Sequence, residues 1–429
     1  MAFVATDAIR GRFSAAMSEM YRAEVPQYGT LLKLVADGNS AVLARDPALA
    51  DTLRRNGEVE RLAGERHGAI RLGTDAELAL IRRAFAVMGM HPVGYYDLAA
   101  AGVPVHSTAF RPIEQAALTA NPFRIFTSLL RLELIEDARL RAEAAAILDA
   151  RRILTPGALE LIERAEREGG LDVAAAIDFV DELLETFRWH DTATVSAESY
   201  DRLLDAHRLI ADVVSFRGPH INHLTPRTLD IDAVQAAMPA HGITPKDKIE
   251  GPPRRACPVL LRQTSFKALD ERIVFLSLSG HSVPGRHSAR FGEVEQRGVA
   301  LTRKGRALYD EILAAQPERD RFAELPDDWT DLRRQGLAFF RYSGRAVRRA
   351  DLEAAIDSGD IVADPILYED FLPVSAAGIF QSNLGDAARG AYAARSSREE
   401  FEAALGTPLF DEFALYEAAE ARSLAAVTL

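Results

Sequence analysis

Two histidines stand three residues apart in GPHINHLTPRTLD, residues 218–230, with one proline before the first and another after the second. A neutral imidazole binds divalent transition metals, so His220 and His223 are both candidate ligands. On an extended strand, residues three apart point to opposite faces. Both side chains therefore reach one metal only if the prolines bend the chain, and the spacing alone leaves open whether either histidine is a ligand.

A third candidate ligand, His67, lies far upstream in ERHGAIRLGT, residues 65–74. If this segment is a strand, His67 and Arg71 share one face and are about 13 Å apart along it. The pattern fits either a functional site or an exposed polar edge of a sheet.

Two acids stand two residues apart in RFGEVEQRG, residues 290–298. On a strand, Glu293 and Glu295 share one face, where like charges repel each other unless a cation or an arginine lies between them. Arg297 continues this face and can neutralise one of the acids. The pattern indicates either a cation site or a structural ion pair.

Two imidazoles and one carboxylate form the ligand set of non-haem Fe(II) oxygenases, which leaves coordination positions open for substrate and O₂. His67 or the pair His220 and His223, together with Glu293 or Glu295, satisfies this set. The chemistry does not choose among these combinations.

The composition describes an acidic protein. With 51 Lys+Arg against 63 Asp+Glu, the net charge of the 429 residues is −12, which argues against a nucleic-acid partner. Cys257 is the single cysteine, so intramolecular disulfides and thiolate zinc clusters are excluded. The N-terminal residues lack the apolar core of a signal peptide, and no run approaches the roughly 20 apolar residues of a membrane span. We therefore expect a cytoplasmic protein with no membrane partner.

The elements that must position these residues differ between the two halves of the chain. Apolar residues at helical spacing predict helices over 7–25, 76–90, 155–170, 172–189 and 196–216, the first of them ended by Pro26. Residues that favour strands dominate 257–269, 272–280 and 290–302, and a helix is predicted over 304–315. GHSVPGRHS, residues 280–288, is predicted to be a turn region, with His281 and His287 exposed. Helical layers around a mainly antiparallel sheet indicate an α+β protein.

FGEVEQRG resembles the final metal-binding strand of 4-hydroxyphenylpyruvate dioxygenase and hydroxymandelate synthase, where a Phe-x-Glu-x-Ile-Gln-Arg pattern places its glutamate on iron. The match selects Glu293, followed by Gln296 and Arg297, whereas Glu295 stands where those enzymes have an apolar residue. Those enzymes belong to the vicinal oxygen chelate superfamily. The resemblance implies βαβββ modules that form an antiparallel β-sheet core cupping a metal, surrounded here by extensive helices.

A resemblance that extends over nearly the whole chain is to the 2-oxoadipate dioxygenase/decarboxylase family, also called hydroxyglutarate synthases. Six separate segments in the family's order carry it: 25–35, 65–74, 90–98, 220–232, 290–302 and 371–384. The resemblance implies that His67, His223 and Glu293 bind Fe(II). It also implies that Arg71 holds the substrate for catalysis, and that Gln263, Val374 and Ser375 line the substrate pocket.

The activity implied by this resemblance is the conversion of 2-oxoadipate and O₂ to 2-hydroxyglutarate and CO₂, a step of lysine catabolism. We expect one interwoven catalytic unit over residues 1–429. Its parts are a helical N-terminal part with the first ligand segment (1–119), a helical subdomain (120–216), a β-rich metal-binding core (217–302) and a mixed C-terminal part (303–429) with a pocket loop at 371–385. Two alternatives remain: a related metal-dependent oxygenase that acts on another 2-oxo acid, and a non-catalytic helical binding or regulatory protein.

Overall fold

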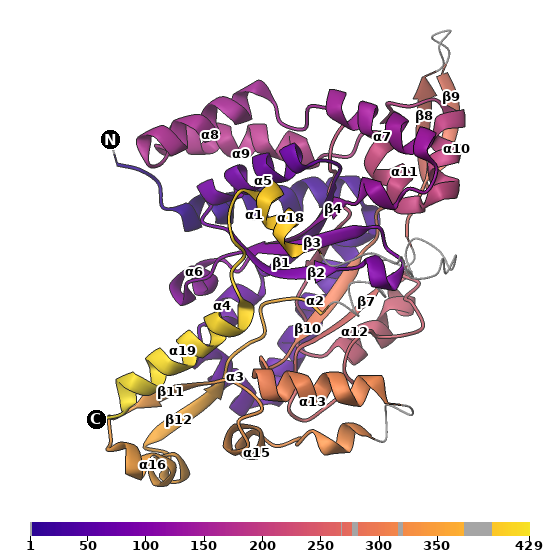
Figure 1. The fold of residues 1–429 in the computed structure, drawn as a ribbon. Coiled ribbons are helices and arrows are strands. Elements are labelled where there is room, and N and C mark those ends of the chain that lie inside the picture. Colours follow the sequence, from indigo (N-terminus) through magenta and orange to yellow (C-terminus); the bar gives the residue numbers. More distant parts are fainter. Residues whose placement is uncertain (1, 267, 277–281, 316–320, 373–396) are drawn as a thin grey trace.

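The computed structural model describes residues 2–266, 268–276, 282–315, 321–372 and 397–429. Helices and several small sheets alternate along the chain, so the α+β class expected from the sequence is confirmed (Figure 1). In the part of the chain that is described, no helix is both long and apolar enough to cross a membrane.

The largest sheet has five strands in the order β2-β3-β4-β1-β6. Their bounds are β1 Arg66–Leu72, β2 His91–Asp97, β3 Val105–Arg111, β4 Arg124–Leu130 and β6 His223–Pro226. β1 runs parallel to β4 and antiparallel to β6, and the other neighbours are antiparallel. β1 is thus held by strands on both sides. β4 lies at the start of residues 120–216, for which the sequence indicated helices.

A second pair of strands continues beside this sheet. β10 (Glu293–Arg297) is antiparallel to β7 (Leu261–Ser265). An isolated bridge joins Arg227, just after β6, to Glu295, and the Thr228 backbone N–H donates to the Glu295 carbonyl over 2.7 Å. Hence β1, β6 and β10, which lie far apart in sequence, follow one another in space.

Long helices cover the large sheet (Figure 1). They are α1 Thr6–Glu24, α2 Pro26–Arg45, α5 Asp75–Val87, α8 Pro156–Glu168 and α9 Val173–Leu184. Their apolar side chains, such as Phe13 of α1, pack into one core with side chains from one face of the sheet, such as Ile70 and Phe110. Pro26 does more than end the first helix, because it occupies the first position of α2, where its missing N–H leaves no hydrogen bond unmade.

The helix predicted over 196–216 is two helices, α10 (Ala197–Ala206) and α11 (Arg208–Ser215). His207 between them is extended, with φ −173°, and its Nδ1 accepts a hydrogen bond from the Leu209 N–H. Its side chain therefore caps α11, a local preference that apolar periodicity does not reveal.

The turn predicted over residues 280–288 is wrong for its described part, because Ser282–His287 forms strand β9. β9 lies at the edge of the sheet β5-β8-β9, where Pro284 removes no hydrogen bond needed by a further strand. The predicted exposure of His287 is also wrong, since its side chain is buried. His281 lies outside the described residues. The partner strands are β5 Thr192–Ala193 and β8 Glu271–Leu276.

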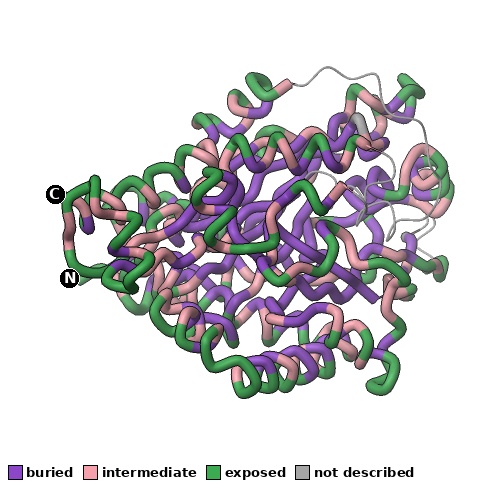
Figure 2. The backbone as a smooth tube through the Cα atoms, turned by 90° about the horizontal axis from the view of Figure 1, so that it is seen from below, coloured by how far each residue is buried: buried purple, intermediate pink, exposed green. Residues whose placement is uncertain are grey.

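The remaining elements enclose the two strand systems. The strands are the antiparallel pair β11 Phe340–Gly344 and β12 Ile361–Pro365. The helices are α3 Pro47–Arg55, α4 Glu58–Leu62, α6 Gln115–Ala120, α7 Ala138–Ala150, α12 Ile231–Ala237, α13 Arg303–Ala314, α15 Trp329–Arg334, α16 Leu352–Ser358, α18 Arg398–Leu405 and α19 Glu412–Val427. Buried backbone is concentrated in the middle of the molecule, and most exposed residues lie on the outer helices (Figure 2). The metal-ligand candidates lie on strands in this buried region.

Candidate metal centre

Three side chains from three strands converge in the interior. His67 on β1, His223 on β6 and Glu293 on β10 each offer a ligand atom, and these atoms all lie within 4.8 Å of one another. The register explains the convergence of the histidines, since His67 is opposite Thr225, two residues from His223 on the same face. The three side chains are buried, with 1%, 6% and 0% of their residues' surface exposed.

The chemistry of this group fits a divalent transition metal. Burial lowers the pKa of His223 to about 4, which keeps its imidazole neutral, as a metal ligand must be. His223 Nδ1 and Glu293 Oε2 are buried and have no hydrogen-bond partner among the described residues. Buried lone pairs without a partner are unfavourable, and a bound cation would satisfy them. Two imidazoles and a carboxylate are a common donor set for Fe, Mn or Zn.

The carboxylate of Glu293 is held in place by its neighbours. Its Oε1 accepts hydrogen bonds from Thr225 Oγ1 over 3.1 Å and from Gln263 Nε2 over 2.8 Å. Gln263, which the resemblance placed in the substrate pocket, thus contacts the carboxylate of a candidate ligand. Thr225 was missed at the sequence level, although its position two residues after His223 places both on one face of a strand.

Glu295 occupies a different position from Glu293. His67 Nε2 lies 3.1 Å from Glu293 Oε1, whereas His67 Nδ1 lies 3.0 Å from Glu295 Oε2. One histidine therefore faces the ligand group with one nitrogen and Glu295 with the other. A carboxylate behind a metal-binding imidazole fixes its tautomer and orientation.

Arginines keep Glu295 ionised. Burial by itself raises the pKa of Glu295, but Arg297 and His67 outweigh it and hold this pKa well below its usual range. Arg297 Nε donates to Glu295 Oε1 over 2.8 Å, and Arg124 Nη1 donates to the same oxygen over 3.4 Å. The repulsion between two acids on one face is thus relieved in two ways, by arginines at Glu295 and by imidazoles at Glu293.

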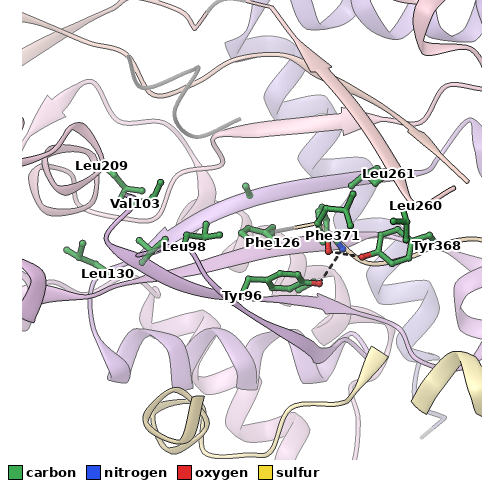
Figure 3. Close-up of a cluster of buried hydrophobic side chains, with 14 of the residues drawn as sticks. Tyr96, Leu98, Val103, Phe126, Leu130, Leu209, Leu260, Leu261, Tyr368 and Phe371 are labelled. Carbon is green, nitrogen blue, oxygen red and sulfur yellow. Dashed lines mark hydrogen bonds between the residues drawn. The ribbon is translucent and has the colours of Figure 1, made fainter. Parts of the chain in front are cut away.

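Aromatic rings enclose the histidines. Phe371 lies edge-on to His67 with 5.0 Å between ring centroids, and Phe291 lies 4.9 Å from His223. Figure 3 shows the backbone of Phe371 held from both sides: its N–H donates to Tyr96 Oη and its carbonyl accepts from Tyr368 Oη. These contacts place the start of the predicted pocket loop against the ligand group. Val374 and Ser375, farther along that loop, lie outside the described residues.

Arg71 lies on the face of β1 that carries His67, as the spacing predicted. It is buried and forms an ion pair with Asp212 on α11, a residue that was not singled out from the sequence. His220 Nε2 lies 3.2 Å from the same carboxylate and is not a member of the ligand group. The two histidines of the opening motif thus serve different clusters.

Comparisons with known proteins can be set beside this geometry. A family model described as 2-oxoadipate dioxygenase/decarboxylase matches residues 13–383. A 2-oxoadipate dioxygenase/decarboxylase from Pseudomonas putida is 58% identical, covering 99% of this chain and 97% of the relative. The protein of the same name from Escherichia coli is 57% identical, with 98% of each chain covered.

Solved structures agree with the sequence comparisons. The crystal structure of a hydroxyglutarate synthase from Pseudomonas putida in complex with 2-oxoadipate superposes with a TM-score of 0.90. The two chains are 56% identical, and the match covers 99% of this chain and 98% of the other. The whole architecture, and not one motif, is therefore shared.

Proposed function

Because this chain belongs to the 2-oxoadipate dioxygenase/decarboxylase family, we propose that it converts 2-oxoadipate and O₂ to 2-hydroxyglutarate and CO₂. The observation that carries the proposal is the buried group of His67, His223 and Glu293, with Arg71 on the same strand as the first histidine. Both oxygen atoms of O₂ enter the organic product, one in the carboxylate formed when CO₂ leaves and one in the new hydroxyl group. No second oxidisable substrate is therefore required.

The metal that we propose for this group is Fe(II), held by His67, His223 and Glu293. When bound, Fe(II) would supply a site for the 2-oxo acid and the redox chemistry that activates O₂. The role of the protein is to hold two imidazoles and one carboxylate in place, and Thr225 and Gln263 do so for the Glu293 carboxylate. A single anionic ligand leaves the site positive, which favours an anionic substrate.

Arg71 is the residue that we propose for binding a carboxylate of the substrate. A planar guanidinium binds a carboxylate through two parallel hydrogen bonds, which a lysine cannot reproduce. In a protein of net charge −12, a doubly charged substrate needs a local concentration of positive charge. Fixing one end of the substrate in this way determines which carbon is held beside the reacting oxygen.

The strand order supports a further relation, to the vicinal oxygen chelate fold. Residues from β1 to β4 follow the order β1-α5-β2-β3-α6-β4, in which the short α6 is inserted before the last strand and the first strand is parallel to the last. We infer that this unit is a βαβββ module, and that β6, β10 and β7 extend it around the ligand group. Most of the remaining residues form helices around these strands.

The test is an O₂-consumption assay of protein reconstituted anaerobically with Fe(II), run across a panel of 2-oxo acids with identification of the products. We expect 2-oxoadipate to give 2-hydroxyglutarate with one O₂ consumed and one CO₂ released per turnover. Protein that binds iron but oxidises an aromatic 2-oxo acid in preference would contradict the proposed substrate. Protein that binds no iron would contradict the oxygenase activity itself.

A further inference from the structure

Asp212 is the one charged residue in the buried part of α11. Every residue of α11 from Leu209 to Ser215 is buried, and Asp212 is 3% exposed. A carboxylate in such surroundings is strongly unfavourable unless positive or hydrogen-bonding groups surround it. The partners of the Asp212 carboxylate therefore indicate its role.

The two oxygens of Asp212 face different partners. Oδ2 contacts Nη1 of Arg71 on β1. Oδ1 lies 2.9 Å from Nε2 of His287 and 3.2 Å from Nε2 of His220. His287 in turn contacts the Tyr200 hydroxyl through Nδ1, over 2.7 Å. A chain of contacts thus runs from Tyr200 through an imidazole and a carboxylate to the guanidinium.

This arrangement keeps Asp212 ionised. Burial raises the pKa of its carboxyl, but His220 and Arg71 outweigh burial and hold the pKa well below its usual range. The carboxylate therefore remains a charged acceptor for the guanidinium at neutral pH. Trp189 supports the cluster, lying parallel to His287 at 6.0 Å and edge-on to His220 at 4.7 Å between ring centroids.

The guanidinium held by Asp212 is close to the ligand group. Burial is the main cause of the low pKa of His223, and the positive charge of Arg71 contributes to it. Arg71 thus pairs with Asp212 through its guanidinium and shares one face of β1 with the candidate ligand His67.

We propose that Asp212 is a positioning residue, which holds the Arg71 guanidinium in the orientation that binds the substrate carboxylate. The inference rests on the proposed function, because it assigns Asp212 a role only through Arg71. Stability alone does not account for the pair, since apolar residues in place of a buried ion pair often leave stability unchanged or higher. Removing Asp212 leaves the charge of the guanidinium but takes away the ion pair made from α11, and a displacement of about 1 Å can lower a rate by about 10²-fold.

The test compares Asp212→Asn with the wild-type protein, both loaded with Fe(II), by steady-state kinetics with 2-oxoadipate. We expect kcat to fall at least tenfold while KM changes less than threefold, because Arg71 keeps its positive charge but its guanidinium is no longer held in the same orientation. In an Arg71→Met background, adding Asp212→Asn should lower kcat no further. A kcat within twofold of wild type at equal iron content would overturn the proposal, as would the full tenfold loss in the Arg71→Met background.

Asp364→Asn is a matched control. Asp364 is 6% exposed and paired with Arg55 over 2.8 Å, but it lies on β12, away from the ligand group. The control should retain the wild-type kcat and iron content. If the loss in Asp212→Asn merely follows the amount of folded, iron-loaded protein, the residue is structural and the proposal is wrong.

His287→Leu provides a second route if Asp212→Asn does not fold. It keeps both members of the ion pair but removes the 2.9 Å contact that steadies Asp212. We expect kcat to fall at least threefold at unchanged iron content, and an unchanged kcat would overturn the proposal. Wild-type protein that does not turn over 2-oxoadipate would instead contradict the proposed function, so the two failures are distinguishable.

Discussion

The difference between Glu293 and Glu295 is set by which nitrogen of His67 each one faces. Glu293 lies on the side of Nε2, with the other candidate ligands, and Glu295 lies on the side of Nδ1, where two arginines bind it. Two acids of the same type, two residues apart, therefore have separate roles.

We predict that Glu295→Gln weakens Fe(II) binding about 10- to 100-fold, because His67 loses the charged partner that orients it. Glu293→Gln should abolish tight binding. Competition with a coloured chelator under anaerobic conditions measures both affinities. Glu369→Gln is the matched control, since it also removes a buried carboxylate that pairs with Arg124, without touching the candidate ligands. Stronger iron binding by Glu293→Gln than by Glu295→Gln would reverse the assignment of the two acids.

The histidines of the opening motif give a second prediction at this scale. His223→Ala and His67→Ala should each bind less than a tenth of the iron bound by wild type, because each removes one of the three proposed protein ligands. His220→Asn should retain the full iron content, since its imidazole contacts Asp212 instead. Iron measured by elemental analysis after gel filtration checks this. Iron loss in His220→Asn with retention in His223→Ala would contradict the assignment.

At the scale of elements, the centre depends on how closely β1 and β6 approach. Gly68 lies beside His67, and a Cβ placed there would meet Ile221 Cδ1 at 2.6 Å and the His223 carbonyl oxygen at 3.4 Å. The segment that carries His223 therefore packs directly on the glycine. A side chain at this position would have to displace the Ile221 side chain, which packs beside the strand that carries His223.

We predict that Gly68→Ala lowers the free energy of unfolding by about 1–3 kcal/mol, the usual effect of overpacking a core, and weakens Fe(II) binding. Gly38→Ala in α2 is the control, because the added Cβ meets only Val234 Cγ2, at 3.4 Å, and helix propensity favours alanine. Urea unfolding and chelator competition measure the two effects. Equal behaviour of the two variants would show that β1 and β6 tolerate the added methyl group.

The sequence predicted elements better than their boundaries and contacts. Apolar periodicity predicted the long helices, and the six matching segments pointed to three residues that the structure brings together from three separate strands. Asp212 could not be predicted, because its partners Arg71 and His287 lie far from it in sequence and meet only in the folded chain. His287 was wrongly predicted to be exposed, because its partner Asp212 also lies far from it in sequence. A Gly/Pro-rich segment predicts a turn, whereas here an edge strand tolerates the proline.

At the scale of the whole molecule, the C-terminal helix α18 packs against the sheet that carries the candidate ligand His67. His106 on β3 takes part in this packing, since its ring lies 4.6 Å from Phe401 of α18 and its Nδ1 lies 3.3 Å from Tyr95 Oη. Burial, with a contribution from Arg131, lowers the pKa of His106 to about 4. Between about pH 4 and pH 6.5, the imidazole is therefore mostly neutral in the folded protein and mostly protonated in the unfolded chain.

We expect this shift to make the stability of the folded protein depend on pH. The pKa of His106 is lower in the folded state than in the unfolded chain, where it is about 6.5. The contribution of the neutral imidazole to the free energy of unfolding is therefore fully present above pH 6.5 and is lost as the pH falls toward 4. We predict that wild type loses up to about 3 kcal/mol more than His106→Asn between pH 7.5 and pH 4. Urea unfolding of both proteins across this range measures the difference. Parallel pH profiles would contradict the prediction.

The position of β1 between β4 and β6 has a consequence for the choice of substrate. His67 and Arg71 stand on one continuous strand that is hydrogen-bonded on both sides, so the span from the proposed metal to the proposed carboxylate clamp cannot easily stretch or shrink. Under the proposed function, we expect this strand to set the length of the diacid that fits. A 2-oxo diacid one methylene shorter or longer than 2-oxoadipate would reach both ends only by bending, and we expect chain length to be read more strictly than the groups between the two ends.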